Sequence, residues 1–383
     1  MVVAVRLIYI GNASDSVYET QSRALVDEFR RSGIDVQHLE GLKFRDFFKG
    51  GSLFCNFKER RFPILPVFPG LIFMQFLFLA VSVVRVFGFS KSVFHVRSDV
   101  LGSIFVRFAW ILGIKEEQIV IDVRGATYWE FIDYRFRPGH CLSELRKLSL
   151  NFLRQSLRGR NCKFTAVSPA LSDYVADAYS VKCEVVPCIS PFKWTPPPAP
   201  QKKLQARLEL GLPTHSLLVV AVNGGGSPWQ LPIKDIDSIA SESLLVLNLS
   251  SREADSPFVI TRYLNGEDYE KALLASDAAL MIRADSVVNR VAVPVKYLEY
   301  AAKSLPIIAN GSVDSVTDYI ESTTRGIIVD SLEEITPDLV QSLVSTCHDT
   351  AHIESCEEWL QSHAPFRVAE QYQGVYARVF VGS

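Results

Sequence analysis

The chain has 383 residues, 48% of them hydrophobic, and a formal net charge of −2. This length exceeds what one hydrophobic core serves and predicts two domains, while the hydrophobic content and positive mean hydropathy exclude a disordered protein. Seven cysteines without regular spacing do not suit the framework of a disulfide-stapled secreted domain, so a reducing, cytoplasmic setting is the simpler expectation.

The net charge hides an asymmetry between the two halves. Residues 1–200 contain 26 Lys+Arg and 18 Asp+Glu, whereas the remainder contains 14 and 24. A basic half joined to an acidic half fits a protein whose first half faces an anionic surface. Nucleic acid would also be attracted to the basic half. The sequence has no basic run interleaved with aromatics and no nucleic-acid motif, so we expect no such partner.

The first elements predict a Rossmann-like opening. A buried-strand run over 2–10 ends in Gly11, an amphipathic helix follows over 19–32, and the next strand starts at Asp35. The full G-x-G-x-x-G fingerprint is absent, so dinucleotide binding has little support. The apolar strand runs straight into a polar loop, and we expect no signal peptide.

The most hydrophobic segment is 63–89, which follows an aromatic and basic stretch over 41–62. Prolines at 63, 66 and 69 restrict a helix to about 70–87, the short edge of the ~20 residues that a membrane span needs. Three interpretations remain open: a buried core helix, a helix that also docks on lipid, and a true span. The basic and aromatic flank favours docking over a span.

Two strands expected over 92–96 and 118–123 carry polar residues at or near their carboxyl ends. Ligands of open α/β sheets bind at that edge, so these residues are candidates for ligand contact, although each also suits a structural ion pair. They are His95, Arg97, Asp122 and Arg124.

Residues 135–163 carry eight Arg or Lys and a single acid, Glu144. Leucines and phenylalanines recur there at helical spacing, which predicts a basic amphipathic helix. Its polar face is either solvated or in contact with anionic lipid headgroups.

The run 195–200, TPPPAP, predicts a stiff, extended linker. Beyond it, a buried strand over 217–222 ends in a loop that contains Gly224, Gly225 and Gly226. Glycine lets backbone N–H groups approach a phosphate closely, and a plain tight turn is the alternative.

A strand–helix–strand unit over 279–310 is the most informative part of the second half. A polar loop with Arg283, Asp285 and Asn289 follows the first strand, and a helix starting near 294 places Lys296 and Glu299 one turn apart. This spacing predicts a parallel crossover. A cation and a carboxylate there suit a nucleotide, and an ordinary crossover with solvated charges is the alternative.

A histidine and cysteine series near the end of the chain has a spacing that metal binding could use. His348, His352 and Cys356 follow one another at intervals of four residues. This supplies too few ligands without a third element, so we expect no metal site.

The 279–310 unit resembles the GT-B glycosyltransferases, and within them the family 4 type that uses nucleotide-sugar donors. The likeness rests on Arg283, Asn289 and the run PVKYLEYAAKSLPII over 294–308, and similar pieces are 122–125 with Glu130, 167–174, 185–187 and the Gly-rich loop ending in Trp229. It covers nearly the whole chain. It implies an α/β fold of two Rossmann-like domains that face each other across a cleft.

The resemblance also implies residue roles. Glu299 would bind the donor ribose, Lys296 and Arg283 would neutralise the diphosphate, and Gly225 and Gly226 would offer backbone amides, with Asn289 in the same donor site. Arg124, Arg283 and Lys296 are the residues expected to act in catalysis, because fixed cations stabilise a leaving diphosphate. The residues expected to line the acceptor side are Gly11, His95, Arg97, Asp122, Arg124 and Gly125. Retention of anomeric configuration is implied, with a UDP-, GDP- or dTDP-sugar donor and no required metal or cofactor.

Three departures from the family pattern bear on the donor sugar more than on the reaction class. Val291 stands where many members have a first glutamate, and Ser304 stands where a glycine is usual. After the Gly-rich loop, Lys234 is the single basic residue near the expected arginine and lysine pair.

The resulting expectation is a cytoplasmic glycosyltransferase at the inner face of the cell membrane, acting on a glycan or lipid-linked acceptor in surface polysaccharide or glycoconjugate synthesis. Residues 1–194 would form a membrane-facing acceptor domain, 195–204 a linker, 205–365 the nucleotide-sugar domain, and 366–383 a helix crossing back to the first domain. The alternatives are a sugar-nucleotide isomerase or epimerase of the same fold and a non-catalytic partner of another transferase.

Overall fold

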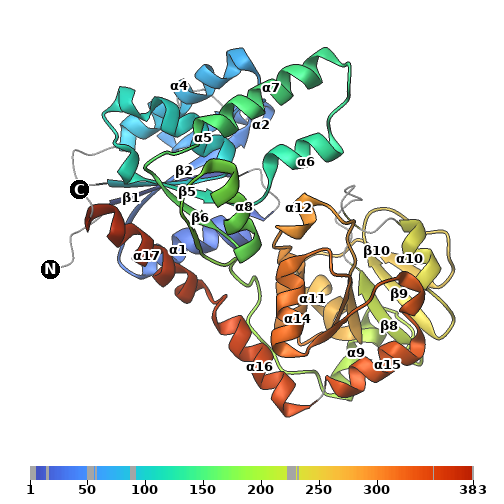
Figure 1. The fold of residues 1–383 in the computed structure, drawn as a ribbon. Helices are drawn as coiled ribbons and strands as arrows, with labels where there is room; N and C mark the ends of the chain where they lie inside the picture. Colours follow the sequence, from blue (N-terminus) through green and yellow to red (C-terminus); the bar gives the residue numbers. More distant parts are fainter. Residues whose placement is uncertain are drawn as a thin grey trace. The chain divides into compact units, whose positions relative to one another are not determined.

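The structure is a computed structural model that describes residues 6–13, 17–49, 56, 58–86, 92–221, 230, 233–347 and 349–381. The chain divides into two compact units (Figure 1). Unit 1 comprises Met1–Ile189 and Ala364–Ser383, and unit 2 comprises Ser190–His363.

Unit 1 is built on a seven-stranded sheet in which every described pair is parallel. The strand order is β3-β2-β1-β4-β5-β6-β7. The strands are β1 (Arg6–Asn12), β2 (Asp35–Lys43), β3 (Arg61–Ile64), β4 (Ser92–Arg97), β5 (Ile119–Val123), β6 (Lys163–Ala166) and β7 (Cys183–Val185). The central strands β4 and β5 are buried throughout, as expected where helices cover both faces of a parallel sheet.

Helices cover both faces of this sheet (Figure 1). The helices of unit 1 are η1 (Tyr18–Arg23), α1 (Ala24–Arg31), α2 (Phe44–Lys49), α4 (Pro69–Val86), α5 (Asp99–Phe108), η2 (Ala109–Leu112), η3 (Glu116–Gln118), α6 (Thr127–Tyr134), α7 (Cys141–Ser156), α8 (Pro169–Tyr179) and α17 (Pro365–Val381). One face packs on α1 and α17 through a core that includes Leu7, Phe29 and Val375. A separate apolar cluster joins α4, α5 and α7 through Ile72, Ile104 and Leu153.

The hydrophobic helix expected near 70–87 is α4. Its inner side is buried at Ile72, Phe76, Leu79 and Val83, so it packs as a core helix on one side. Among the described residues it is the one helix that is long and apolar enough to cross a membrane, with a mean hydropathy of 1.9 and 39% of its residues buried. Its outer side leaves large apolar side chains exposed.

Unit 2 contains a six-stranded parallel sheet of order β10-β9-β8-β11-β12-β13. The strands are β8 (Leu217–Ala221), β9 (Leu244–Leu249), β10 (Val259–Arg262), β11 (Ala278–Met281), β12 (Ile307–Ala309) and β13 (Gly326–Ile328). The helices are α9 (Pro200–Glu209), α10 (Ile233–Ile239), α11 (Gly266–Ala275), α12 (Val287–Arg290), α13 (Val295–Ala302), α14 (Asp314–Thr323), η4 (Leu332–Glu334), α15 (Pro337–Thr346) and α16 (Thr350–Gln361).

The run 195–200, expected to be the stiff and extended part of the linker, has no helix or strand as far as Ala199. Helix α9 begins at Pro200, because proline is well tolerated at the first position of a helix. Thr195 also donates its backbone N–H to the carbonyl of Ala302 at 2.8 Å, which ties the start of this segment to unit 2.

Ser304 shows why the family pattern has glycine at its position. Its φ is +53°, the left-handed region that glycine adopts without strain. The serine here is held by a hydrogen bond from its hydroxyl to the carbonyl of Thr195 at 2.6 Å.

Gly326 makes a close backbone approach that tests the packing of unit 2. A Cβ added there would lie 2.3 Å from the carbonyl oxygen of Ile307 on the neighbouring strand. We expect Gly326→Ala to lower the free energy of unfolding by about 2–3 kcal/mol, measured by urea denaturation. The matched control is Gly374→Ala in α17, where a Cβ has room and should stabilise by about 0.5–1 kcal/mol. Equal effects of the two substitutions would contradict this packing.

Candidate functional site

The strand order reverses once in each sheet. In unit 2 the reversal lies between β8 and β11, and in unit 1 it lies between β1 and β4. At such a point the connections leave in opposite directions, which opens a crevice at the carboxyl ends of the two strands where ligands of α/β sheets bind. These two crevices are the reference points for the positions of the site residues that the sequence predicts.

In unit 2, the expected parallel crossover over 279–310 is confirmed. Strands β11 and β12 pair in parallel, with Ala279 opposite Ile307, and α12 and α13 connect them. Arg283 follows the carboxyl end of β11. Its backbone N–H donates to Asn310 Oδ1 at 3.1 Å, and Asn310 Nδ2 donates back to the carbonyl of Arg283 at 2.8 Å. The loop is therefore fixed by an asparagine that follows the neighbouring strand.

Lys296 and Glu299 meet in the first turns of α13. The Lys296 ammonium donates to Glu299 Oε2 at 3.0 Å, and Glu299 also accepts from the hydroxyl of Tyr269 in α11. The ammonium lies 4.8 Å from the centre of the Tyr269 ring. Burial and the neighbouring Glu299 carboxylate raise the pKa of Tyr269, so its hydroxyl stays a donor. The Glu299 side chain is 8% exposed and the Lys296 side chain 37%, so the carboxylate is fixed while the ammonium can move.

Asn289 and Val291 are buried, which gives them roles inside the protein. Asn289 Nδ2 donates to the carbonyl of Ala284 at 2.8 Å, so its amide braces the loop that carries Arg283. Asp285 is exposed and pairs with Arg290 at 2.8 Å.

Part of the expected donor site lies outside the described residues. These positions are Gly224, Gly225, Gly226, Trp229 and the side chain of Lys234. The described strand β8 ends at Ala221 beside β11, so the chain leaves β8 at the same crevice from which Arg283 departs.

In unit 1, the buried carboxylate of Asp122 lies near the carboxyl end of β5, opposite Arg97 on the neighbouring strand β4. It accepts from Arg124 Nε at 2.8 Å, from the Tyr372 hydroxyl at 3.0 Å and from the Thr165 hydroxyl at 3.2 Å. Burial alone would raise the pKa of this carboxyl, but the Arg124 guanidinium and the adjacent His95 hold it well below its usual range. Asp122 is therefore a fixed negative charge that orients Arg124.

The expected acceptor-side residues divide into supporting and accessible groups. Asp122 and His95 have no exposed surface, so they support Arg124 from behind instead of presenting a surface to a ligand. Arg124 retains 16% of its side-chain exposure. Arg97 is 5% exposed, and its Nη1 is buried with no hydrogen-bond partner in the described part of the chain. A Cβ on Gly11 would approach the Tyr9 ring at 3.2 Å, whereas a Cβ on Gly125 would meet open space.

Several residues that contact Asp122, His95 and Arg124 were not predicted from the sequence, because they come from elements far away along the chain. Tyr372 and Tyr376 of α17 supply hydroxyls to Asp122 and His95, the latter at 2.7 Å. Cys188 lies 3.5 Å from Arg124 Nη1. The tyrosine doublet at four-residue spacing in the last helix was a visible signal, but its partner could not be named from sequence.

A row of aromatic and imidazole rings extends this network across the sheet. Tyr9 of β1 lies opposite both His38 of β2 and His95 of β4, in register. Its ring stacks on His95 at 4.5 Å between centroids and meets His38 edge-on at 5.3 Å.

An apolar pocket of about 180 Å³ opens beside the same edge of unit 1. Asn12 at the end of β1 and Ser98 after β4 are among its polar lining residues, and Leu65, Leu71 and Ile104 are among its apolar ones. Such a lining suits a hydrocarbon portion of a ligand.

No group of three or more metal-ligating side chains gathers anywhere in the described ranges. Cys356 is buried against Tyr319 at 3.3 Å, and His352 Nδ1 lies 3.2 Å from the carbonyl oxygen of Thr346. His348 lies outside the described residues.

Taken together, two Rossmann-like units with parallel sheets define the fold class of the GT-B glycosyltransferases, as the sequence predicted. Among solved structures, sucrose-phosphate synthase from Thermosynechococcus elongatus has a TM-score of 0.68 at 12% identity, covering 99% of this chain and 100% of that chain. HepE from Anabaena, solved with UDP-glucose, has a TM-score of 0.66 at 11% identity, covering 97% and 99%. WaaG, a glycosyltransferase involved in lipopolysaccharide biosynthesis, has a TM-score of 0.63 at 11% identity, with the same coverage. No family model and no curated protein matches the sequence.

The buried histidines of unit 1 predict a pH dependence of stability. Burial lowers the pKa of both His38 and His95, that of His38 to about 4. In the unfolded chain they titrate near 6.5, so between about pH 6.5 and 4 the unfolded state binds protons that the folded state does not. The free energy of unfolding should therefore fall with decreasing pH, by up to about 1.4 kcal/mol per pH unit for each histidine.

Urea denaturation at a series of pH values measures this slope. His38→Gln should reduce it, whereas His215→Gln at an exposed position of unit 2 should leave it unchanged. An unaltered slope in His38→Gln would show that His38 is not buried in its neutral form.

Proposed function

We propose that the chain is a glycosyltransferase that moves a sugar from a nucleotide-diphosphate donor to a glycan or lipid-linked acceptor. The observation that carries the proposal is the Lys296–Glu299–Tyr269 cluster beside the crevice of unit 2, with Arg283 on the adjoining loop. Neighbours of the same fold include HepE, solved with UDP-glucose and with UDP, which supports a nucleotide-sugar donor.

In this proposal Glu299 accepts hydrogen bonds from the ribose hydroxyls of the donor. The Lys296 side chain that pairs with it is 37% exposed, so the ammonium can move aside and leave the Glu299 carboxylate to the hydroxyl donors of the ligand. The released ammonium then joins Arg283 at the diphosphate. Negative charge grows on that diphosphate as the glycosidic bond breaks, and cations already in place lower the barrier.

We propose that unit 1 binds the acceptor. Arg124, held by Asp122, and the nearly buried Arg97 supply positive charge near the carboxyl ends of β4 and β5. The apolar pocket nearby fits the hydrocarbon part of a lipid-linked acceptor. Membership of family 4, retention of configuration and independence of metal ions belong to the same proposal, and they come from the sequence resemblance.

We expect Glu299→Ala to abolish turnover of the donor, because the substitution removes the ribose acceptor. The Glu299 side chain is 8% exposed, so circular dichroism and the melting temperature check that the variant stays folded. Glu270→Ala is the matched control, since that acid lies in unit 2, is 44% exposed and pairs with Lys303. Thermal shift with UDP-, GDP- and dTDP-sugars identifies the donor base, and product analysis measures turnover. Full activity of Glu299→Ala would refute the site.

The same experiment separates the alternatives. A sugar-nucleotide isomerase or epimerase would convert the nucleotide sugar without an acceptor. A non-catalytic partner of another transferase would show no turnover with any donor, and the absence of a glutamate at position 291 favours that alternative.

We propose that the α4 and α7 side of unit 1 contacts a membrane. The protein would lie in the cytoplasm, at the inner face of the cell membrane. Large apolar side chains are exposed on that side of unit 1, namely Phe73, Met74, Leu77, Val81 and Val84 on α4 and Leu142, Leu145, Leu148 and Phe152 on α7. Trp110 of the nearby η2 is 72% exposed. Cations flank the apolar surface, with Arg107 lying 4.6 Å from the centre of the Phe152 ring. Apolar area together with basic flanks is what binds an amphipathic helix to anionic lipid.

Co-sedimentation with phosphatidylglycerol vesicles tests this contact. The protein should bind at low salt and release at high salt, and it should bind phosphatidylcholine vesicles weakly. Phe73→Glu with Leu148→Glu should lose binding, whereas Leu208→Glu on α9 of unit 2, at a position exposed to a similar degree, should keep it. Absence of binding by the unaltered protein at low salt would refute membrane contact.

A further inference from the structure

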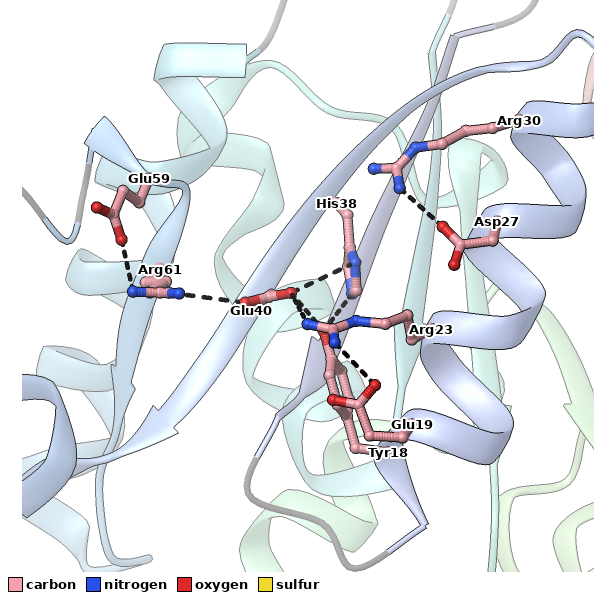
Figure 2. A network of polar contacts seen from close by, with 9 residues as sticks. All are labelled: Tyr18, Glu19, Arg23, Asp27, Arg30, His38, Glu40, Glu59 and Arg61. Atoms are coloured by element: carbon pink, nitrogen blue, oxygen red, sulfur yellow. Dashed lines mark hydrogen bonds and ion pairs between the residues drawn. The ribbon is translucent and has the colours of Figure 1, made fainter. Parts of the chain in front are cut away.

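A second polar cluster lies in unit 1, and the proposed function gives no role to the side chains that form it (Figure 2). It surrounds a hollow of about 460 Å³ between α1 and the start of β3, at the outer edge of the sheet. Four arginines line this hollow: Arg23, Arg30, Arg60 and Arg61. We call it the arginine hollow.

The four guanidinium groups come from two parts of the chain. Arg23 and Arg30 belong to η1 and α1, while Arg60 and Arg61 stand at the start of β3. Gathering like charges costs energy unless acids or a ligand compensate them. Three of the arginines have a carboxylate partner on their own segment, which makes the pairs Arg23–Glu19 at 2.8 Å, Arg30–Asp27 at 3.1 Å and Arg61–Glu59 at 2.5 Å.

These three ion pairs are exposed, with arginine side chains 40–50% accessible, and pairs of this kind contribute little to stability. A ligand that offers oxygen atoms can therefore engage the same guanidinium groups without a large loss. Figure 2 shows the side chains converging from α1 on one side and from the start of β3 on the other.

Arg60 differs from the other three. It forms no ion pair with any residue that the structure describes, although it lies close enough to Asp35 to help lower the pKa of that carboxyl. Its φ is +63°, a left-handed conformation that is uncommon for a residue with a side chain. Strained backbone of this kind gathers at sites where a particular side chain is needed.

The floor of the hollow offers acceptors and donors for hydroxyl groups. The carboxylate of Glu40 accepts from the Tyr18 hydroxyl at 2.5 Å and is faced by Arg61 at 3.7 Å and by Arg23 at 3.8 Å. His38 lies 3.8 Å from the same carboxylate, and burial keeps its imidazole neutral by lowering its pKa to about 4. The neutral ring of His38 and the carboxylate of Glu40 both line the hollow, and together they match the mixed donors and acceptors of a sugar ring.

We propose that the arginine hollow binds an acidic saccharide, with the carboxylate or phosphate of the ligand on Arg60 and its neighbouring guanidinium groups and the ring hydroxyls on Glu40 and His38. Guanidinium forks recognise both kinds of oxyanion in a bidentate manner. The volume lies within the range of about 300–1,000 Å³ found for small-molecule pockets. The saccharide part rests on the proposed function, whereas the binding of an oxyanion does not.

The test uses calorimetric titration of the full chain with four probes: glucuronate, glucose 6-phosphate, glucose and inorganic phosphate. Both acidic sugars should bind at least about tenfold more tightly than glucose or inorganic phosphate, because a charged bidentate contact is worth that factor or more. Arg60→Gly should weaken both acidic sugars by at least about tenfold. Glycine adopts a positive φ without strain, so this variant should keep or raise the melting temperature, and its loss of binding would not reflect unfolding.

Two controls separate this proposal from the others. Arg31→Gln removes a 74% exposed guanidinium of α1 that pairs with Glu28 and does not line the hollow, and it should bind both acidic sugars as the unaltered protein does. Glu299→Ala should lose donor turnover and keep binding at the hollow. Equal affinity in Arg60→Gly and the unaltered protein would overturn the proposal, as would inorganic phosphate binding as tightly as glucose 6-phosphate.

Discussion

The constraint on which both units depend is the geometry of a parallel sheet. Parallel strands need a crossover between neighbours, and when the direction of addition reverses, two strands end side by side with their connections leading apart. Each unit has one such reversal, between β1 and β4 and between β8 and β11. Two arginines lie at or just after the ends of strands beside these reversals, namely Arg97 in unit 1 and Arg283 in unit 2.

Unit 1 adds an electrostatic requirement to that geometry. A carboxylate with no exposed surface, Asp122, is tolerated because a guanidinium and two hydroxyls compensate it. The same contacts hold Arg124 in one orientation while leaving part of it accessible. A charge that is costly to bury thus fixes the position of a cation that a ligand can reach.

The sequence predicted the fold class and the crossover of unit 2, because apolar runs of strand length and helical spacing are local properties. It also placed Lys296 and Glu299 on one face of a helix, where the structure joins them. It could not name Tyr269 as the second partner of Glu299, since that contact links α11 with α13 and depends on packing.

Other residues lie where the sequence predicts them, but the structure gives them a supporting role in place of direct contact with a ligand. His95 and Asp122 do stand on the strands expected, yet zero exposure makes them a support for Arg124, and strand spacing alone cannot tell burial from accessibility. Asn289 likewise braces the loop of Arg283. The arginine hollow was not predicted from the sequence, because β2 and α2 separate Arg23 and Arg30 from Arg60 and Arg61 along the chain, and the two pairs meet only in the folded protein.

Helix α17 gives unit 1 a discontinuous sequence. Its tyrosines complete the hydrogen bonds of Asp122 and His95, although all of unit 2 separates them along the chain. During synthesis, residues 1–189 therefore leave the ribosome before Tyr372, whose hydroxyl donates to Asp122 in the folded unit, has been made. The apolar residues of unit 1 that pack on α17 stay uncovered until then. Long-range closure of this kind slows folding and exposes intermediates to aggregation. Asp122, which holds Arg124, therefore gains its full set of hydrogen bonds only after unit 2 has been synthesised. Folding of unit 1 is in this way coupled to the synthesis of unit 2.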